Sequence, residues 1–444
     1  MPDMPLVVDL DGSLTRTDTL VESILQVIRR SPLNVLRLFG WLLHGRALFK
    51  HRIALLTQPC AETLPYHSSL LAYLRSEKSR GRRLILATAA HERIAHAVSD
   101  HLGLFDRVLA SNQHVNLKGA AKLKAIQAEL GPAFAYAGDS RADIPIWQQA
   151  QAAVLVGVSP AVANTIRSST PIECEFPRAQ AKLSVWLRAL RLHQWLKNLL
   201  LFVPLLTSFS LVNMDRLLSV MLGFLAFSLA ASATYVVNDL WDLENDRAHP
   251  RKRRRPFASG QLPIFQGLAV AALLLGSALL MAAAVSPAFL LMVLAYLVST
   301  SAYSWALKNY VLIDVLLLSL LYTFRILAGS VAIGVATSSW LLAFSVFVFL
   351  SLALVKRCSE LVSLSLTGEQ ELRGRDYRAT DLVVLWPLGV GAAISAVVVF
   401  GLFISAPETQ ARYASPQLLW LVALGLIYWL ARLWIKTARG EMHD

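Results

Sequence analysis

The chain has 444 residues, of which 55% are hydrophobic and only 16% are charged, and its mean hydropathy is +0.51. Soluble globular domains carry about 25% charged residues, so the composition excludes a disordered chain, a coiled coil and an ordinary soluble enzyme as descriptions of the whole protein. The formal net charge of +13 is compatible with nucleic acid, a membrane surface or phosphorylated ligands, and the apolar content favours the membrane.

Polarity divides the chain into a soluble region, 1–180, and a membrane region, 186–444. The first residues lack the basic segment and long apolar run of a signal peptide, so we expect the soluble domain to stay in the cytoplasm. Within it, the stretch 20–57 has apolar segments interrupted by basic residues. We expect helices of the soluble domain there, of a kind that can lie on a membrane surface.

The first motif is an apolar segment, Val7-Val8, followed by two carboxylates, Asp9 and Asp11. At the end of a buried strand, this pair suits phosphoryl transfer. Asp9 would attack the phosphorus, while Asp11 would protonate the leaving oxygen and then activate water. Taken alone, the pair is equally compatible with an acidic turn.

Three later features strengthen the catalytic interpretation. A second predicted strand ends in the hydroxyl of Thr88, and a predicted helix begins near Lys122. A third predicted strand is followed by Asp139 and Asp143. A hydroxyl, a lysine and paired acids supply the groups needed for phosphate binding and a Mg²⁺ site.

Over about residues 1–165, these motifs resemble the haloacid dehalogenase (HAD) superfamily of phosphatases. The resemblance implies an α/β, Rossmannoid domain with a small helical cap between the first two motifs. It also implies phosphate contacts from Thr88 and Lys122, with Lys118 as a possible substitute for the latter. Ser13 departs from the family's usual Thr or Val, and a degenerate, purely structural domain is the alternative. The implied Mg²⁺ ligands are Asp9, Asp11, Asp139 and Asp143.

Long apolar runs fill the second region, and about 20 residues suffice to cross a bilayer. Eight spans are predicted: 198–213, 217–237, 264–285, 287–306, 311–333, 337–356, 382–405 and 416–435. Arginine and lysine concentrate in the loop 238–263 and after the sixth span, which the positive-inside rule assigns to the cytoplasm. We therefore expect an integral protein of the inner membrane with both termini cytoplasmic. Because the basic residues lie close to span ends, a nucleic-acid partner is not predicted.

The second predicted span ends in Asn238 and Asp239, followed by Asp242 and Asp246. Spacings of three and four residues place the three aspartates on one face of a helix. Carboxylates grouped at a membrane boundary need cations, and Mg²⁺ bridging to a pyrophosphate would supply them. A basic run follows, of which most members suit a membrane anchor, whereas Arg255 before Pro256 is the best candidate for a phosphate contact.

Over about residues 186–435, these motifs resemble the UbiA superfamily of intramembrane prenyltransferases. The resemblance implies an all-α polytopic bundle of eight or nine transmembrane helices, with an active site open to the cytoplasm and to lipid. The segments around Trp195, Tyr303, Asp314 and Arg375 resemble the branch of decaprenyl-phosphate phosphoribosyltransferases, which use phosphoribosyl pyrophosphate (PRPP). Leu192 departs from that branch, which usually has proline there.

After the sixth span stand Lys356, Arg357 and Glu360, where ordinary members of the family have a second aspartate-rich motif. A basic pair suits phosphate-rich substrates better than a second metal cluster. Arg325 lies inside an apolar span, where ionisable residues usually have a function, so we expect it to bind phosphate. Lys197 and Lys308 lie at span edges and are candidates for either phosphate contacts or anchoring.

The sequence therefore predicts a Mg²⁺-dependent transfer of phosphoribosyl from PRPP to a polyprenyl phosphate, with Asp239 and Asp242 in the catalytic cluster. A fused phosphatase would act on the product. Two alternatives stay open. One is prenyl transfer from a prenyl diphosphate to a small acceptor, and the other is a membrane-anchored phosphatase with a non-catalytic bundle.

Overall fold

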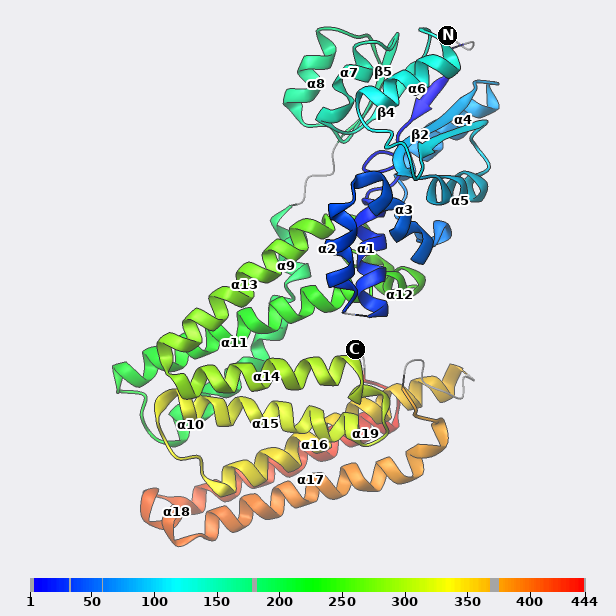
Figure 1. The fold of residues 1–444 in the computed structure, drawn as a ribbon. Coiled ribbons are helices and arrows are strands. Elements are labelled where there is room, and N and C mark those ends of the chain that lie inside the picture. The colour runs from blue at the N-terminus through cyan, green and yellow to red at the C-terminus, as the bar shows by residue number, and fades with distance from the viewer. Residues whose placement is uncertain (1–3, 32, 58, 178–181, 368–374, 443–444) are drawn as a thin grey trace. The chain divides into compact units, whose positions relative to one another are not determined.

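The computed structural model describes residues 4–31, 33–57, 59–177, 182–367 and 375–442. They form two compact units (Figure 1). The first contains residues 1–190 together with 235–270, and the second contains 191–234 together with 271–444. The segment 235–270, which holds the aspartate motif and the basic run, thus groups with residues 1–190 in the first unit.

The first unit is built on a parallel sheet with strand order β3-β2-β1-β4-β5-β6 in the described part of the chain. Val7 faces one layer of the core with Ile85, whereas Leu6 and Val8 face the other with Leu84. Both faces are buried because helices cover them, which explains why these strands read as continuous apolar runs. The strands are β1 (Leu6–Val8), β2 (Leu84–His91), β3 (Arg107–Ser111), β4 (Ala135–Gly138), β5 (Ala152–Val156) and β6 (Ile172–Phe176).

The covering helices follow the strands in the alternating order of an α/β fold. They are α4 (Ser68–Ser79), α5 (Glu92–Leu102), α6 (Ala120–Leu130), α7 (Ile144–Trp147) and α8 (Pro160–Arg167). Between β1 and α4, the predicted helical cap consists of α1 (Thr19–Arg30), α2 (Asn34–Leu43) and α3 (Arg46–Leu56). Val27, Leu38 and Ile53 form its small core. The expected α/β domain with a helical cap is confirmed.

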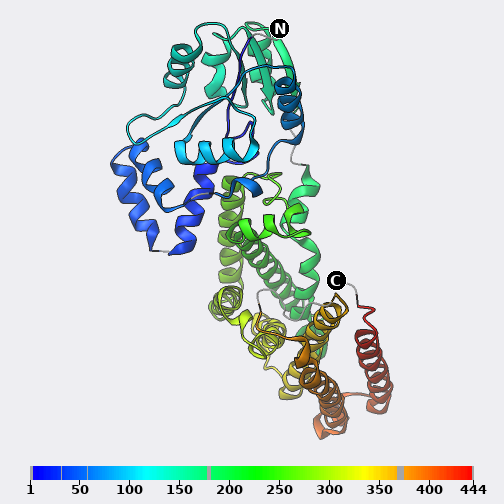
Figure 2. The same ribbon diagram turned by 90° about the vertical axis from the view of Figure 1, so that its right-hand side faces the viewer.

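The second unit is helical, and Figure 2 shows its long helices side by side. It contains η3 (Leu192–Phe202), α10 (Val203–Thr207), most of α11 (Met214–Trp241) and most of α13 (Ile264–Val285). The remaining long helices are α14 (Pro287–Trp305), α15 (Ile313–Ile333), α16 (Ser339–Thr367), α17 (Leu382–Ser405) and α19 (Leu419–Ala438). At Gly329 a Cβ would lie 2.1 Å from the carbonyl oxygen of Leu201, so only glycine permits this approach of α15 to η3.

Seven helices of the described residues are long and apolar enough to cross a membrane, one fewer than predicted. The missing span is 198–213, which is divided between the 3₁₀ helix η3 and the short helix α10. Pro204 lies at the start of α10, and Phe209 beyond its end adopts the left-handed φ of 53°. Because these features interrupt regular α-helix, the segment does not form one helix of spanning length.

Candidate functional sites

The sheet brings the predicted phosphatase residues together at the carboxyl ends of its central strands. Asp9 directly follows β1, Thr88 lies within β2, and Asp139 directly follows β4. Strands β2 and β4 pair with β1 on either side, which places residues more than 100 positions apart at one edge. The hydroxyl of Thr88 accepts a hydrogen bond from the amide of Ala90 at 3.0 Å.

Lys122, near the start of α6, contacts the predicted nucleophile. Its Nζ lies 2.8 Å from Oδ2 of Asp9 and 3.8 Å from Oδ1 of Asp143, and it donates to the hydroxyl of Tyr136 at 3.0 Å. Burial would lower the pKa of Lys122, but the carboxylates of Asp9 and Asp143 raise it overall. Lys122 is therefore the buried cation of this site, whereas the alternative, Lys118, is exposed.

Three carboxylates of the site suit a divalent cation. Oxygens of Asp9, Asp139 and Asp143 all lie within 4.8 Å of one another, a group that among the described residues does not include Asp11. Burial, together with Asp9 and Asp143, raises the pKa of Asp139 to about 7, because crowded buried carboxylates resist ionisation unless a cation joins them. Gly12, at φ +79°, permits this crowding, since a Cβ there would lie 2.2 Å from Oδ2 of Asp139.

Asp11 has a different environment. Its Oδ1 accepts a hydrogen bond from the amide of Thr19, at the start of α1, at 2.8 Å. Burial, followed by the charge of Asp18, raises the pKa of Asp11 to about 8. A carboxyl that keeps its proton near neutral pH can act as a general acid, whereas Asp9 held by Lys122 presents a carboxylate oxygen.

The aspartate motif of the second region lies at a break between two helices. Asn238 and Asp239 belong to the last turn of α11, Asp242 stands at the break, and Asp246 belongs to α12 (Leu243–Ala248). The prediction of a single helix through all three aspartates is therefore wrong. The backbone of Asp242, at φ −94° and ψ 15°, leaves the helical conformation between α11 and α12. Asp239 and Asp246 are nevertheless both nearly buried, at 3% and 2% exposure, whereas Asp242 is half-buried.

Arg255 joins the two buried aspartates. Its Nη1 lies 3.1 Å from Oδ1 of Asp239 and 2.7 Å from Oδ2 of Asp246. Burial raises the pKa of Asp246 against the opposing effect of Arg255. The preceding basic residues, Arg251 to Arg254, are exposed, which fits their interpretation as a surface anchor. Arg255, at the end of the basic run, is thus part of the aspartate cluster.

The remaining predicted residues, Lys197, Lys308, Arg325, Lys356, Arg357 and Glu360, belong to the second unit. Arg325 is buried and donates to Asn198 at 3.0 Å and to the hydroxyl of Tyr296 at 2.9 Å. Its guanidinium lies 5.3 Å from the ring centre of Tyr322, and Nζ of Lys197 lies 5.7 Å from the same ring. Two predicted phosphate-binding cations therefore gather around one tyrosine.

Arg357 is fully buried in an ion network, whereas its neighbour Lys356 is exposed. Nη2 of Arg357 lies 2.6 Å from Oδ2 of Asp314, its Nη1 pairs with Glu360, and Arg375 approaches the same Asp314 oxygen at 2.8 Å. Lys308, in the short helix η5 (Leu307–Asn309), is half-buried. Two carboxylates near the second predicted site are thus already paired with arginines.

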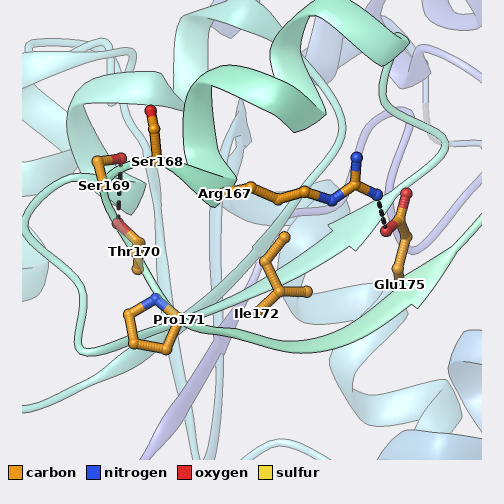
Figure 3. Close-up of a pocket in the computed structure, with 7 residues that line it drawn as sticks. All are labelled: Arg167, Ser168, Ser169, Thr170, Pro171, Ile172 and Glu175. Atoms are coloured by element: carbon orange, nitrogen blue, oxygen red, sulfur yellow. Dashed lines mark hydrogen bonds and ion pairs between the residues drawn. The ribbon is translucent and has the colours of Figure 1, made fainter.

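Several partners were missed at the level of sequence: Asn198, Tyr296, Tyr136, Glu22, and the role of Asp314 as an ion-pair partner. A signal existed for Asp314, since an acid in the first turn of an apolar helix needs a cation. A separate surface pocket is lined by Arg167, Ser168, Ser169, Thr170, Pro171, Ile172 and Glu175 (Figure 3). It lies where β6 begins, and in a parallel sheet that is the edge opposite Asp9 and Asp139, the predicted catalytic residues.

Each of the two regions of the chain matches the model of a known protein family. The model of the UbiA prenyltransferase family matches residues 200–442, and that of haloacid dehalogenase-like hydrolases matches residues 6–148. The uncharacterized protein y4nM of Sinorhizobium fredii is 37% identical over 447 residues, covering 99% of this chain and 86% of that protein.

Two further similarities involve the membrane region. Decaprenyl-phosphate phosphoribosyltransferase of Mycobacterium tuberculosis is 36% identical over 221 residues, covering 49% of this chain and 72% of that enzyme. Among solved structures, a UbiA homolog from Archaeoglobus fulgidus bound to GPP and Mg²⁺ has a TM-score of 0.46 at 18% identity, covering 57% of this chain and 88% of that one.

Proposed function

This chain belongs to the UbiA prenyltransferase family and carries a haloacid dehalogenase-like hydrolase domain, and on that basis we propose that it makes a ribosylated lipid in two steps. In the first step, an oxygen of a polyprenyl phosphate bonds to C1 of the ribose of PRPP while the bond from C1 to pyrophosphate breaks. In the second, the hydrolase domain removes the 5-phosphate of the transferred ribose.

The choice of PRPP as donor rests on the residues around Lys356, Arg357 and Glu360, which the structure places within α16 and not beyond its end. A second Mg²⁺ cluster needs carboxylates that are available to a metal. Here Glu360 pairs with Arg357, and Asp314 pairs with Arg357 and Arg375. Exposed Lys356 leaves the site basic, which favours a donor and an acceptor that both carry phosphate. The similarity to a phosphoribosyltransferase supports the same choice.

Asp239, Asp242 and Asp246 are the proposed ligands of Mg²⁺ at the transferase site. Their oxygens are of the type that Mg²⁺ prefers, and a bound ion would neutralise the leaving pyrophosphate. Among the described residues the three carboxylates are not gathered within 4.8 Å as those of Asp9, Asp139 and Asp143 are, so a bound ion would have to draw Asp239 and Asp246 away from Arg255. Arg255 holds Asp239 and Asp246 toward each other and offers a cation to phosphate oxygens. We assign phosphate contacts to Asn238 beside this cluster and, within the second unit, to Lys197, Lys308, Arg325 and Lys356. Arg357 would hold Glu360 in place in that second unit.

In the hydrolase domain, Asp9 would attack the phosphorus of the 5-phosphate and form an aspartyl phosphate. Asp11 gives its proton to the departing ribose oxygen and then takes a proton from the water that releases inorganic phosphate. Lys122 keeps Asp9 oriented and neutralises charge that develops on the phosphoryl oxygens. Mg²⁺ on Asp9, Asp139 and Asp143 would neutralise the phosphoryl group, with Thr88 as a further phosphate contact.

We also propose an inner-membrane location with the hydrolase domain and both termini in the cytoplasm, supported by the loop charges. A lipid-linked product cannot leave the membrane, so a fused phosphatase would meet it at high effective concentration.

Membranes that contain the protein, incubated with labelled PRPP and polyprenyl phosphate, test the proposal by mass detection of the lipid. The expected product is a dephosphorylated ribosyl phosphate lipid. A parallel reaction offers a prenyl diphosphate and a small acceptor. Prenylation of that acceptor without any ribosyl lipid would favour the alternative function.

A further inference from the structure

The cap helix α1 of the hydrolase domain is bonded to the segment that carries the transferase aspartates. Arg247, in α12, donates from Nη1 to Oε2 of Glu22 at 2.8 Å and from Nη2 to Oε1 at 2.7 Å. Both side chains are only 4% exposed. A two-bonded arginine–carboxylate pair fixes orientation as well as distance, because the two planar groups match in one geometry.

Arg247 in turn holds two parts of the aspartate site. It directly follows Asp246 along α12, and its Nε donates to the carbonyl of Ala258 at 3.0 Å. Ala258 lies three residues after Arg255, whose Nη1 contacts both Asp239 and Asp246. The guanidinium fixed by Glu22 therefore connects the helix that presents Asp246 to the segment that presents Arg255.

Other contacts reinforce this connection within the first unit. Glu244 of α12 accepts from Gln26 and lies 3.6 Å from Arg29, both on α1 (Figure 1). Gly260, at φ +68°, sits so close to Arg16 that a Cβ would lie 2.7 Å from the Cβ of that residue. The same helix α1 begins at Thr19, whose amide holds Asp11 of the hydrolase site.

We propose that helix α1 of the cap helps to build the transferase site. Its residue Glu22 acts through Arg247 as a positioning residue for Asp239, Asp246 and Arg255. This inference rests on the proposed function of that cluster in binding a metal-bound diphosphate. Without the Glu22 carboxylate, Arg247 would be a buried charge lacking its fixed partner, and such a charge must move or draw in water. The two segments it joins would then lose their common anchor.

Glu22→Gln in the full-length protein tests the inference, because it removes the charge and keeps the shape. Glu175→Gln is the matched control, since Glu175 pairs with Arg167 on the exposed surface shown in Figure 3. We expect Glu22→Gln to lower ribosyl transfer and to raise the half-saturating Mg²⁺ concentration by about 10- to 100-fold, the usual effect of removing a partner of a metal ligand. The control should stay within about twofold.

Hydrogen exchange measures the same change without any substrate. Amides of residues 243–260 should exchange faster in Glu22→Gln than in wild type or the control, while the sheet of the hydrolase domain stays protected. Because the pair acts as a unit, adding Arg247→Met to Glu22→Gln should cause little further loss of transfer.

The outcomes separate the two proposals. Wild-type protein that forms no ribosyl lipid would contradict the proposed function, while hydrogen exchange would still decide whether Glu22 orders the segment. Unchanged exchange at 243–260, faster exchange that spreads over the whole domain, or faster exchange with full transfer activity would each contradict a positioning role.

A second, independent observation concerns the outer face of α2. Leu33, just before the helix, and Leu36, Phe39 and Leu43 along it are 75%, 73%, 68% and 88% exposed. Their spacing of three and four residues defines one helical face, while Leu38 packs inward. Large apolar side chains gathered on one exposed face mark an interaction surface.

The charges around this face favour an anionic bilayer as its partner. Residues 31–60 contain four arginines and lysines and no aspartate or glutamate, and Arg37 and Arg46 are exposed. An apolar face flanked by cations is typical of helices that lie in the headgroup region. We infer that α2 lies on the surface of the membrane in which the protein is embedded, and so holds the hydrolase cap at the lipid.

Spin labels test this placement in full-length protein reconstituted in nanodiscs of neutral and anionic lipid. Leu36→Cys and Leu43→Cys carry the label in a Cys60→Ser background, and Val115→Cys, an exposed position beyond β3, is the control. Labels on α2 should relax several-fold more with oxygen, which concentrates in lipid, than with a water-soluble nickel chelate, and the control should show the reverse. If labels on α2 relax more with the nickel chelate, the helix faces water and contact with lipid is contradicted. If neither reagent reaches the labels, and this protection depends on protein concentration, a second copy of the protein covers α2 instead of lipid.

Discussion

The hydrolase site and the transferase site assemble their charged residues in different ways. In the hydrolase domain, parallel strands deliver Asp9 and Asp139 to one edge, although 130 positions separate them in the sequence. In the helical unit, packed helices bring the charges together, and Arg357 pairs both with Glu360 of its own helix and with Asp314 of α15, 43 positions earlier. A sheet edge gathers catalytic groups by topology alone, whereas a buried charge in an apolar bundle must first find a counter-charge. Charge alone therefore identifies catalytic residues more directly in the first site than in the second.

The strongest test of the comparison removes a buried acid of the transferase cluster. Asp239→Ala should reduce ribosyl transfer by about 100-fold or more, because Arg255 then keeps Asp246 as its partner and the metal site loses a ligand. Asp215→Ala, at an exposed position near the start of the same helix, is the matched control. Transfer is measured as ribosyl lipid by mass spectrometry, with and without EDTA. Full activity of Asp239→Ala, or of wild type in EDTA, would exclude the metal–pyrophosphate mechanism.

The equivalent change in the hydrolase site should leave transfer intact and stop the second step. Asp9→Asn removes the nucleophile with little change in shape, so dephosphorylation should fall by at least about 1,000-fold. The lipid should then accumulate with its 5-phosphate, seen as an added phosphate mass. Asp100→Asn, on the exposed face of α5, should give the wild-type product. Identical lipids from Asp9→Asn and wild type would show that the hydrolase domain serves another substrate.

Two adjacent residues of α16, Lys356 and Arg357, distinguish a ligand-binding charge from a structural one. Arg357→Met leaves Asp314 buried with less of its counter-charge, so we expect a loss of about 3 kcal/mol or more in unfolding free energy. Lys356→Met, at an exposed position, should change stability by less than about 0.5 kcal/mol while lowering ribosyl transfer. Thermal unfolding in detergent and the lipid assay measure the two effects. Equal stability of both variants would contradict a structural role for the buried network.

Sequence reasoning succeeded where the pattern follows from chain order. The strand–acid motifs at Asp9 and Asp139, the cap, and all but one of the eight spans appear as predicted, because apolar runs and parallel topology constrain them strongly. It did not reveal the break at Asp242 or the assignment of 235–270 to the first unit, since both depend on tertiary contacts such as that between Glu22 and Arg247. Nor did it show that Arg357 pairs with Asp314 of another helix, α15.

The smallest expected effect concerns the general acid of the hydrolase site. Burial and the charge of Asp18 raise the pKa of Asp11 to about 8. The first step needs the protonated form of Asp11, so the dephosphorylation rate should fall as the pH rises above this value. This decrease forms the alkaline limb of the pH profile, and the transfer step should lack it because transfer does not use Asp11. Assays of each step across pH 6 to 9.5 compare the two sites directly.

Asp18→Asn sharpens this test, because it removes the negative charge and keeps the helix cap. The Asp18 side chain accepts from the amides of Leu20 and Val21, at 2.9 Å and 3.2 Å, and asparagine retains an oxygen for both bonds. With the repelling charge gone, ionised Asp11 is less unfavourable, so its pKa falls and the alkaline limb moves to lower pH. The shift should be less than about one pH unit, since Asp18 is exposed and its charge is screened by salt. A limb that stays in place, or moves upward, would mean that Asp11 is not the group whose proton limits the reaction.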